Sequence, residues 1–355
     1  MTVLLLVLVA LLAYANGSND NSKGVATLVG YGAATPRRAL LYAALTTAIG
    51  AAVSFIYSGG LLKSFSTGLF AQGTGGLDVT FFIAVLLGAF GWVILATFTG
   101  LPVSTTHAIM GSLIGAGLVS VGRDQVRWSV LEKGFVLPLV LSPVLSLTIV
   151  YLLAWPVVWI VKRATVTRQI RVEQLVVAAA ALGAPDRLTV IEATAESQVQ
   201  TRRVSPAANA IHWASGGLIG FARGWNDTPK IAALSLLAFP HRMSISFAIV
   251  SLAMAAGGLI SGRKVLDTMA RKLTPLPLPE SLTASLTTAG LVCMACWEGL
   301  PVSTTQVSTG AIIGAGLKND AGAVKWKKVF EIALSWIITL PAAGLIAATA
   351  KWVIH

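Results

Sequence analysis

Long apolar segments separated by short polar loops dominate the chain. Apolar runs of roughly 20 residues or more, the length that crosses the hydrocarbon core of a bilayer, cover residues 2–33, 39–57, 80–99, 134–161, 211–239, 243–260, 281–297 and 329–352. A membrane β-barrel would instead show segments of about ten residues that alternate in hydropathy. The pattern therefore predicts an all-α, polytopic membrane protein.

Composition and charge agree with this prediction. Only 11% of the residues are charged, against about 25% in soluble domains, and the mean hydropathy is +0.78. The net charge of +12 could indicate a nucleic-acid partner, but in membrane proteins Lys and Arg gather in cytoplasmic loops. We therefore expect no nucleic acid. Cys293 and Cys296 lie inside an apolar segment without a second pair, so we expect packing residues and neither zinc nor redox chemistry.

Two short phrases occur twice in the same order. Gly-Leu-Pro-Val-Ser-Thr-Thr covers residues 100–106 and again 299–305, and an Asn-Asp pair stands at Asn19-Asp20 and at Asn226-Asp227. The Asn-Asp pairs are 207 residues apart and the longer phrases 199 residues apart. Two phrases in one order at nearly one offset indicate an internal duplication.

The duplication divides the chain into repeat 1 (1–161), a linker (162–210) and repeat 2 (211–355). Each repeat is expected to hold three crossings and a re-entrant hairpin, whose two half-helices meet at the longer phrase. Because three is odd, the second repeat would be inserted upside down, as in many transporters. The linker, placed in the cytoplasm, holds either a short amphipathic helix at the membrane surface or a partly ordered connection.

The distribution of positive charge supports this topology. With the N-terminus outside, the outer segments carry 6 Lys and Arg residues and the inner loops carry 17, as the positive-inside rule requires. These inner loops are 35–38, 162–210, 261–280 and 318–328.

The longer phrase has the composition of an anion site. Its proline breaks a helix, and Ser-Thr-Thr then caps a new helix, whose free N–H groups and positive dipole end attract anions. Two inverted copies would face each other and form a cage of donors for a tetrahedral oxyanion. Phosphate also carries protonated oxygens, which intramembrane aspartates could accept, and such aspartates are by default functional. The substrate-binding candidates are Asp20, Ser104, Thr105, Thr106, Asp227, Ser303, Thr304 and Thr305. The alternative for the hydroxyls is ordinary helix capping or interhelical hydrogen bonding.

The doubled phrases resemble the signatures of the inorganic phosphate transporter (PiT) family. The similarity covers GSND, GLPVSTTHAIMGSLIGAG, GWND, GLPVSTTQVSTGAIIGAG and GRKVLDTMARKLTPL, and extends from about residue 13 to 350. The resemblance implies a central phosphate site lined by the Asn-Asp pairs and both hairpins. It also implies cation sites beside it, with sodium possible near Asn19 and Asn226, no other metal or cofactor, and a homodimer in the cell membrane.

Two lysines depart from the pattern of sodium-coupled relatives, which carry Asn three residues after each Asp. Here Lys23 follows Asp20 and Lys230 follows Asp227 at that spacing, one helical turn away, so each lysine can reach its aspartate. An ammonium group there would replace a bound cation, which favours proton coupling over sodium coupling, and a buried lysine could carry the proton. In the alternative interpretation both lysines extend to the membrane interface and only neutralise the aspartates.

Two further residues are candidates for proton transfer. Glu298 directly precedes the second long phrase, and the Glu that the family often carries earlier in this helix is replaced by Ser285. Glu298 is therefore a candidate coupling site, or else a carboxylate bonded to backbone N–H groups at the hairpin tip. His107 follows the first Ser-Thr-Thr and is either a proton relay or a hydrogen-bonding residue on the helix face.

The sequence predicts a secondary active transporter that imports inorganic phosphate with a proton or sodium gradient by alternating access. The inverted halves would rock around a fixed site. The alternatives are a permease for another oxyanion such as sulfate, which the two aspartates would repel because it has no proton to share, or a passive anion channel. We expect no enzyme, because the chain shows neither a nucleophile with a base nor a P-loop or HExxH motif.

Overall fold

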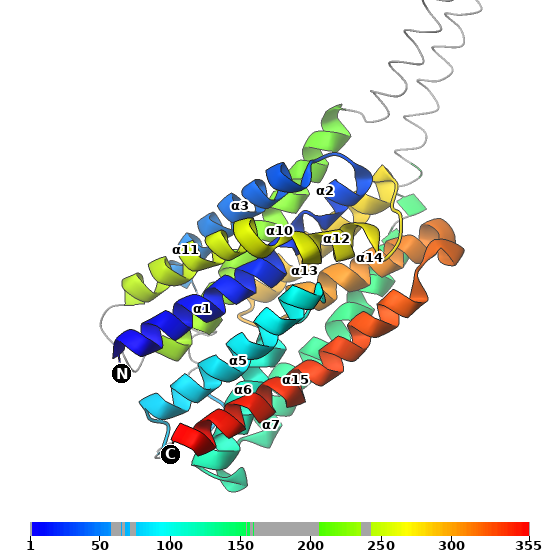
Figure 1. Ribbon diagram of the computed structural model, residues 1–355. Helices are drawn as coiled ribbons and strands as arrows, with labels where there is room; N and C mark the ends of the chain where they lie inside the picture. Colours follow the sequence, from blue (N-terminus) through cyan, green and yellow to red (C-terminus); the bar gives the residue numbers. More distant parts are fainter. Residues whose placement is uncertain are drawn as a thin grey trace, which may run out of the picture.

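The computed structural model describes residues 2–57, 65, 68–71, 76–153, 155–156, 159, 206–235 and 243–354, and Figure 1 draws them as ribbons. These residues are almost entirely helical, and their β structure is limited to an isolated bridge between Phe70 and Val126. The predicted all-α fold is confirmed. The linker up to residue 205 lies outside the described residues, so the alternatives for it stay predictions.

Repeat 1 contributes α1 (Thr2–Asp20), α2 (Ala26–Tyr31), α3 (Pro36–Tyr57), α5 (Val79–Thr99), α6 (Thr105–Ser120), α7 (Trp128–Leu131) and an apolar helix over Leu137–Leu153. Repeat 2 contributes α10 (Pro206–Ala232), α11 (Met243–Ser261), α12 (Arg263–Arg271), α13 (Leu278–Trp297), α14 (Thr304–Asp320) and α15 (Trp326–Ile354). In the described part of the chain, five helices are long and apolar enough to cross a membrane: α1 extended to Gly24, α3, α5, α11 and α15.

Large apolar side chains lie on the outside of the helical bundle, and several charged side chains are buried inside it. Leu252 and Ile337 are more than 70% exposed, whereas Lys23 and Arg223 are each 1% exposed. A soluble protein would show the reverse for charged side chains. This distribution suits a protein whose outer surface faces lipid, and it agrees with the predicted multi-pass membrane protein.

The two Asn-Asp pairs differ in how the helix continues after them. In repeat 1 the α-helix ends at Asp20 and a 3₁₀ turn over Asn21–Gly24 follows. In repeat 2 the predicted interruption at Asn226-Asp227 is wrong, because α10 continues to Ala232 and only then changes to a 3₁₀ turn. The side chains explain the difference: Gly24 disfavours a helix, whereas repeat 2 has Ile231 at the corresponding position.

Both predicted hairpins are present. In the first hairpin, the segment before α5 is hydrogen-bonded to the segment after α6, from Ala71 N to Gln125 O (2.9 Å). In the second hairpin, the segment after α14 is hydrogen-bonded to the segment before α13, from Lys325 N to Leu273 O (2.9 Å). Each hairpin therefore enters and leaves at the same end of the molecule.

The first helix of each hairpin is longer than the half-helix that the sequence predicts. α5 has 21 residues and α13 has 20, or about 30 Å at 1.5 Å per residue. Nothing interrupts these apolar runs before Gly100 and Gly299, whose positive φ angles of 74° and 66° end the helices.

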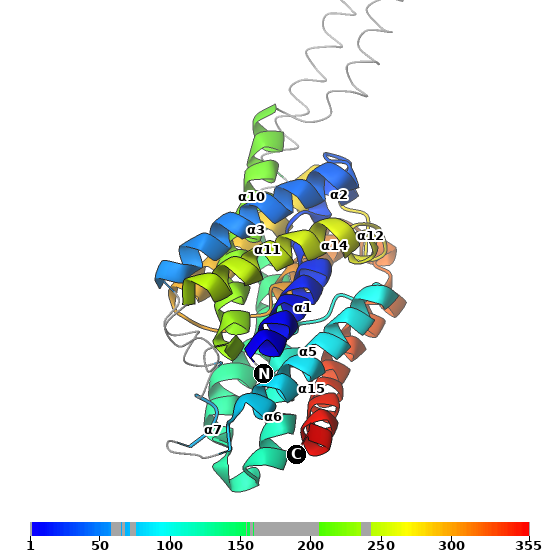
Figure 2. The same cartoon turned by 60° about the vertical axis from the view of Figure 1, so that its left-hand side comes forward.

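Helices of one repeat pack directly against helices of the other. Gly17 of α1 lies against Met254 O of α11, where an added Cβ would come within 1.9 Å, and Gly224 of α10 lies against Thr47 O of α3, where it would come within 2.1 Å. The two glycines, Gly17 and Gly224, are 207 residues apart, and so are the residues that they contact, Met254 and Thr47. In both views α11 of repeat 2 lies between α1 and α3 of repeat 1 (Figures 1 and 2). Equivalent contacts therefore join each repeat to the other.

The hairpins follow the same rule. Gly111 of α6 packs on Leu340 O of α15, and Gly310 of α14 packs on Pro143 O of the Leu137–Leu153 helix. The hairpin of each repeat thus rests on the last helix of the other. The predicted boundaries 1–161 and 211–355 describe the order of the sequence, but in space the repeats interlock.

We predict that Gly17→Ala and Gly224→Ala each destabilise the protein, because the added methyl group meets a backbone carbonyl that cannot move alone. Overpacking of this kind costs about 1–3 kcal/mol. The melting temperature in detergent measures the effect. Gly290→Ala is the matched control, since nothing lies within 4 Å of its Cβ position. Equal melting temperatures in all three variants would contradict the close approach.

Candidate functional site

Polar side chains of both repeats meet where α1 and α10 approach the first turns of α6 and α14. Each of these side chains belongs to a residue that is at most 4% exposed. We refer to them as the central polar cluster: Asn16, Asn19, Asp20, Lys23, Thr105, Thr106, Arg223, Asn226, Asp227, Lys230 and Thr305. The structure therefore brings together most of the site residues predicted from the sequence.

The two Ser-Thr-Thr phrases begin helices, as predicted. Ser104 Oγ accepts a hydrogen bond from His107 N (3.2 Å), and Ser303 Oγ accepts one from Gln306 N (3.3 Å). Both serines are N-caps, which satisfy a backbone donor of the first turn. Thr304 is buried beside Ser303. The serine oxygens are thus occupied as caps, and the threonines provide the hydroxyls of the cluster.

The tips of the two hairpins touch. Thr305 Oγ1 donates to Val103 O (2.7 Å), and Thr106 Oγ1 donates to Val302 O (3.5 Å). Each hydroxyl therefore bonds to the backbone of the opposite repeat. The expected face-to-face arrangement of the two phrases is present, and at this junction their hydroxyls already have acceptors.

Lys23 occupies a pocket of oxygen atoms from both repeats. Its Nζ donates to Asn19 Oδ1 (3.1 Å) and Val103 O (2.9 Å), and it also pairs with Asp20 Oδ1 and Thr305 Oγ1. Carboxylate, amide, carbonyl and hydroxyl oxygens are the ligands that hard cations prefer. The ammonium group therefore takes the position that such a cation would need.

Lys230 repeats this arrangement in the second half. Its Nζ lies 3.4 Å from Asp227 Oδ1, 3.1 Å from Val302 O and 2.8 Å from Thr106 Oγ1. Asn226 is turned differently from Asn19, because its Nδ2 donates to Asp227 Oδ1 and Val302 O, both at 3.0 Å. Neither lysine is more than 1% exposed, so the alternative in which they extend to the membrane interface does not hold for this structure.

Asn16, which we did not single out in the sequence, joins the two aspartates. Its Nδ2 lies 3.0 Å from Asp20 Oδ2, 3.2 Å from Asp227 Oδ2 and 3.0 Å from Thr105 Oγ1. Thr105 Oγ1 in turn donates to Asp20 Oδ2 (3.2 Å). One amide group therefore holds carboxylates from both repeats beside each other, where like charges repel unless cations compensate them.

Arg223 is the second residue of the cluster that the sequence patterns did not single out. Its Nη2 donates to Asn16 Oδ1 (2.5 Å), and its Nη1 donates to Thr47 Oγ1 (3.1 Å) and to Asn21 Oδ1. Its Nε lies 3.7 Å from Asp227 Oδ2, which makes an ion pair without a hydrogen bond. The guanidinium thus links α10 to α1 and α3 across the cluster.

One signal in the sequence could have identified both residues. Asn16 and Arg223 stand four residues before Asp20 and Asp227, and so on the same helix face as these aspartates. They are also 207 residues apart, the offset of the Asn-Asp pairs. Extending the doubled phrase by one turn toward the N-terminus would have added them.

The charges of the cluster do not cancel. Asp20 and Asp227 contribute two negative charges, whereas Lys23, Lys230 and Arg223 contribute three positive ones. With all five ionised, one positive charge is left over. An uncompensated charge away from water is costly, so an anion would stabilise the cluster in this charge state.

The structure does not bring Glu298 to the cluster. Glu298 is the exposed C-cap residue of α13, next to Trp297, which is 78% exposed. Within the described residues it forms no hydrogen bond or ion pair with the cluster. The physical reason is that its side chain is exposed, whereas every residue of the cluster is at most 4% exposed. We therefore leave it out of the coupling mechanism proposed below.

His107 and its counterpart Gln306 lie in the first turns of α6 and α14, and both are buried. Among the described residues His107 Nδ1 and Gln306 Oε1 have no hydrogen-bond partner. The proton relay through His107 therefore stays a prediction, and no hydrogen bond from His107 Nδ1 to a second relay group supports it among the described residues.

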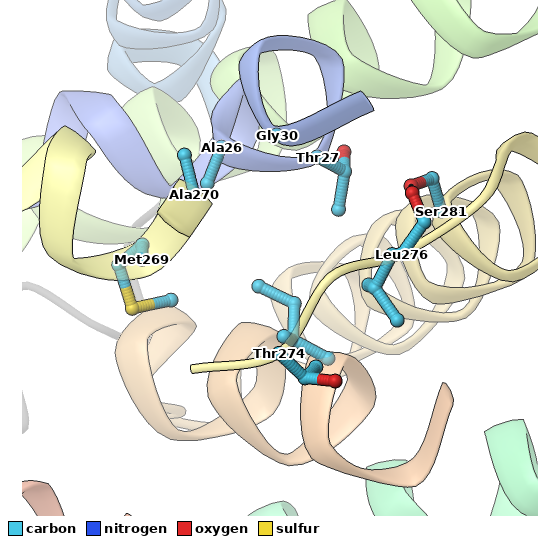
Figure 3. Close-up of a pocket in the computed structure, with 9 residues that line it drawn as sticks. Ala26, Thr27, Gly30, Met269, Ala270, Thr274, Leu276 and Ser281 are labelled. Carbon is cyan, nitrogen blue, oxygen red and sulfur yellow. The ribbon is translucent and has the colours of Figure 1, made fainter. Parts of the chain in front are cut away.

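A pocket lies between α2, α12, α13 and α14 (Figure 3). Thr27, Thr274 and Ser281 provide its polar side chains, and the remaining lining is apolar. Thr27 also bonds to Ser285 Oγ (2.7 Å) and His212 Nε2 (3.2 Å). No residue of the central polar cluster lines this pocket.

Comparison with known proteins places the chain in a family. A model of the phosphate transporter family matches residues 16–347, from the first residue of the cluster to the last helix. The chain belongs to the phosphate transporter family. A protein of Rhizobium meliloti whose name describes a low-affinity inorganic phosphate transporter is 30% identical over 94% of this chain and 91% of its own length. One of Pyrococcus abyssi, named for a phosphate permease, is 29% identical over 98% of this chain and 96% of its own length.

A solved structure supports the fold of this family member. It is named "The sodium-dependent phosphate transporter", and its TM-score with this chain is 0.79. The alignment covers 99% of this chain and 98% of that one, at 23% sequence identity. The likeness confirms the helical fold, and the sodium dependence is a statement about that protein.

We predict that Asn16→Ala destabilises the transporter, because both carboxylates lose the donor that they share. Removing the partner of a buried polar group costs about 1–3 kcal/mol. The melting temperature of the purified protein should fall measurably. Asn319→Ala, at an exposed position of α14, should leave it unchanged, and an equal response of both variants would show that the bridge does not stabilise the protein.

Proposed function

We propose that this family member imports inorganic phosphate across the cell membrane as a secondary active transporter driven by a proton gradient, with alternating access and without a catalytic step. The observation that carries the proposal is the buried cluster with one excess positive charge and a lysine at each cation position. A homodimer in the lipid bilayer, as the family resemblance implies, belongs to the proposal.

The lysines argue against sodium coupling. A sodium ion would need the oxygens of Asp20 or Asp227, the Val103 or Val302 carbonyl and a threonine hydroxyl, which the ammonium groups now hold. Binding sodium beside a protonated lysine would also add repulsion in a medium of low dielectric constant. We infer that the two ammonium groups serve as tethered cations.

The charge count also suggests how a proton enters the cycle. Monobasic phosphate, H₂PO₄⁻, balances the single excess charge of the cluster and brings a proton with it. Selecting this form has the same result as transporting a proton with dibasic phosphate. A pH gradient can then drive uptake although no side chain of the protein releases a proton.

The aspartates favour phosphate over sulfate. Asp20 and Asp227 accept hydrogen bonds but repel an oxyanion without a proton, and sulfate at neutral pH has none. Transport of another oxyanion remains the alternative outcome of the experiment below. A passive channel would require a continuous pore, whereas the cluster is enclosed.

Alternating access needs units that move against each other, and the packing limits which units these are. The sequence predicts that the inverted halves rock as rigid bodies. Since α1 packs on α11, α3 on α10 and α6 on α15, each unit must combine helices of both repeats. We therefore propose movement between mixed units around the cluster.

We predict that proteoliposomes with the purified protein accumulate labelled phosphate under an inward pH gradient and fail to do so under a sodium gradient alone. Lys23→Asn with Lys230→Asn should introduce sodium dependence, because asparagine leaves the oxygen ligands free for a cation. Uptake under each gradient measures both effects.

The controls for this experiment are empty liposomes and Lys272→Asn, which changes an exposed lysine after α12. Uptake by wild type under sodium only would contradict the tethered-cation hypothesis. Competition by sulfate without phosphate uptake would contradict the substrate.

We predict that Asp20→Asn and Asp227→Asn each lower phosphate uptake by at least about 100-fold, since each removes an acceptor and a charge from the cluster. Each aspartate is a short side chain that supplies both a hydrogen-bond acceptor and a charge at one fixed position. Losing a positioned group of this kind lowers the rate by roughly 10²-fold. Asp267→Asn, on the surface of α12 and paired with Arg271, is the matched control. Near-normal uptake in either cluster variant, with protein levels equal, would exclude that aspartate from the site.

A further inference from the structure

Arg223 has hydrogen-bonding capacity that the protein does not use. Guanidinium carries five N–H groups, and the structure gives partners to three of them, two on Nη1 and one on Nη2. Nε has no hydrogen-bond partner among the described residues, although Arg223 is only 1% exposed. A buried donor without an acceptor is rare in proteins, so this one indicates a missing partner.

The unused hydrogens belong to Nε and Nη2. By the covalent geometry of arginine, Nε–H and Nη2 share an edge, and one hydrogen on each nitrogen has no partner here. This edge is the one with which arginine binds carboxylate and phosphate through two parallel hydrogen bonds. Nη1, which faces away from it, is held by Asn21 and Thr47.

The nearest charged acceptor to this edge is too distant to satisfy it. Asp227 Oδ2 lies 3.7 Å from Nε, beyond the 2.7–3.2 Å of an N–H···O hydrogen bond. That oxygen already accepts from Asn16 Nδ2 (3.2 Å). Arginine and aspartate therefore stand side by side, one offering donors and the other an acceptor.

We propose that Arg223 is a substrate-binding residue whose Nε–Nη2 edge takes two oxygens of phosphate, while Asp227 Oδ2 accepts the hydrogen of a neighbouring P–OH group. The pair would then recognise a protonated tetrahedral oxyanion. Sulfate could satisfy the arginine but would place an unprotonated oxygen against the carboxylate. This inference rests on the proposed function. It assigns the selectivity for phosphate over sulfate to Arg223 and Asp227, an arginine–aspartate pair that only repeat 2 contains.

Of the two repeats, only repeat 2 carries an arginine at this position. The position of Arg223 in repeat 1 is taken by Asn16, 207 residues earlier, whose side chain has no charge. Asn16 Oδ1 instead accepts from Arg223 Nη2 (2.5 Å) and so orients the guanidinium. The two equivalent positions thus act together, one as ligand and the other as its support.

The test is direct phosphate binding by the purified full-length protein, measured by titration calorimetry for wild type, Arg223→Lys and Arg223→Gln. Lysine keeps the charge but offers no two-donor edge, so we expect the Kd for phosphate to rise at least about tenfold and the preference over sulfate to shrink. Glutamine should weaken binding further. Lys351→Gln is the matched control, because Lys351 is also a buried cation (4% exposed) but bonds to Thr80 and Asp78 away from the cluster.

The outcomes separate the inference from the function on which it rests. If wild type binds phosphate and Arg223→Lys binds it with an unchanged Kd and unchanged selectivity, Arg223 only holds the helices together and the inference fails. If wild type binds no phosphate, the proposed function fails. If both variants unfold, a structure of wild type with phosphate decides: an anion bonded to Nε and Nη2 supports the assignment, and one bound elsewhere overturns it.

Discussion

Five charged side chains are buried together between the helices, and the remaining structure serves to make that burial possible. Each lysine is surrounded by a carboxylate, a backbone carbonyl and a hydroxyl, and Asn16 donates to both aspartates. An isolated charge in this medium would be very costly, whereas paired and hydrogen-bonded charges are tolerated. With all five groups ionised, the cluster keeps one positive charge that no side chain within it compensates.

Backbone geometry brings these charges together. The hairpin tips expose the Val103 and Val302 carbonyls because one helix ends at a glycine before each valine and the next begins at the serine after it. Close glycine contacts between α1 and α11 and between α3 and α10 bring the helices near enough for side chains as short as Asn and Asp to meet. Small residues have the same role in membrane helices generally, where backbones must approach closely.

The two repeats are similar in plan but not in charge. Lys23 and Lys230 have equivalent surroundings, with each lysine bonded to the valine carbonyl of its own hairpin and to a threonine of the other. Arg223 and Asn16 break this symmetry, as do the opposite orientations of Asn19 and Asn226. The duplicated frame thus carries an asymmetric set of donors and acceptors at its centre.

The sequence by itself determined the membrane helices, the two hairpins, the serine caps and the reach of each lysine to its aspartate. These depend on hydropathy over about 20 residues or on contacts within one turn, which local spacing fixes. Only the tertiary structure decided that the repeats exchange helices, that Asn16 and Arg223 join the cluster, and that Glu298 does not. Those facts depend on which faces of distant helices meet, and a single apolar helix has many faces that would pack equally well. The continuation of α10 through Asp227 belongs to the same group, because packing against α3 outweighs the local tendency of Pro229 to end a helix.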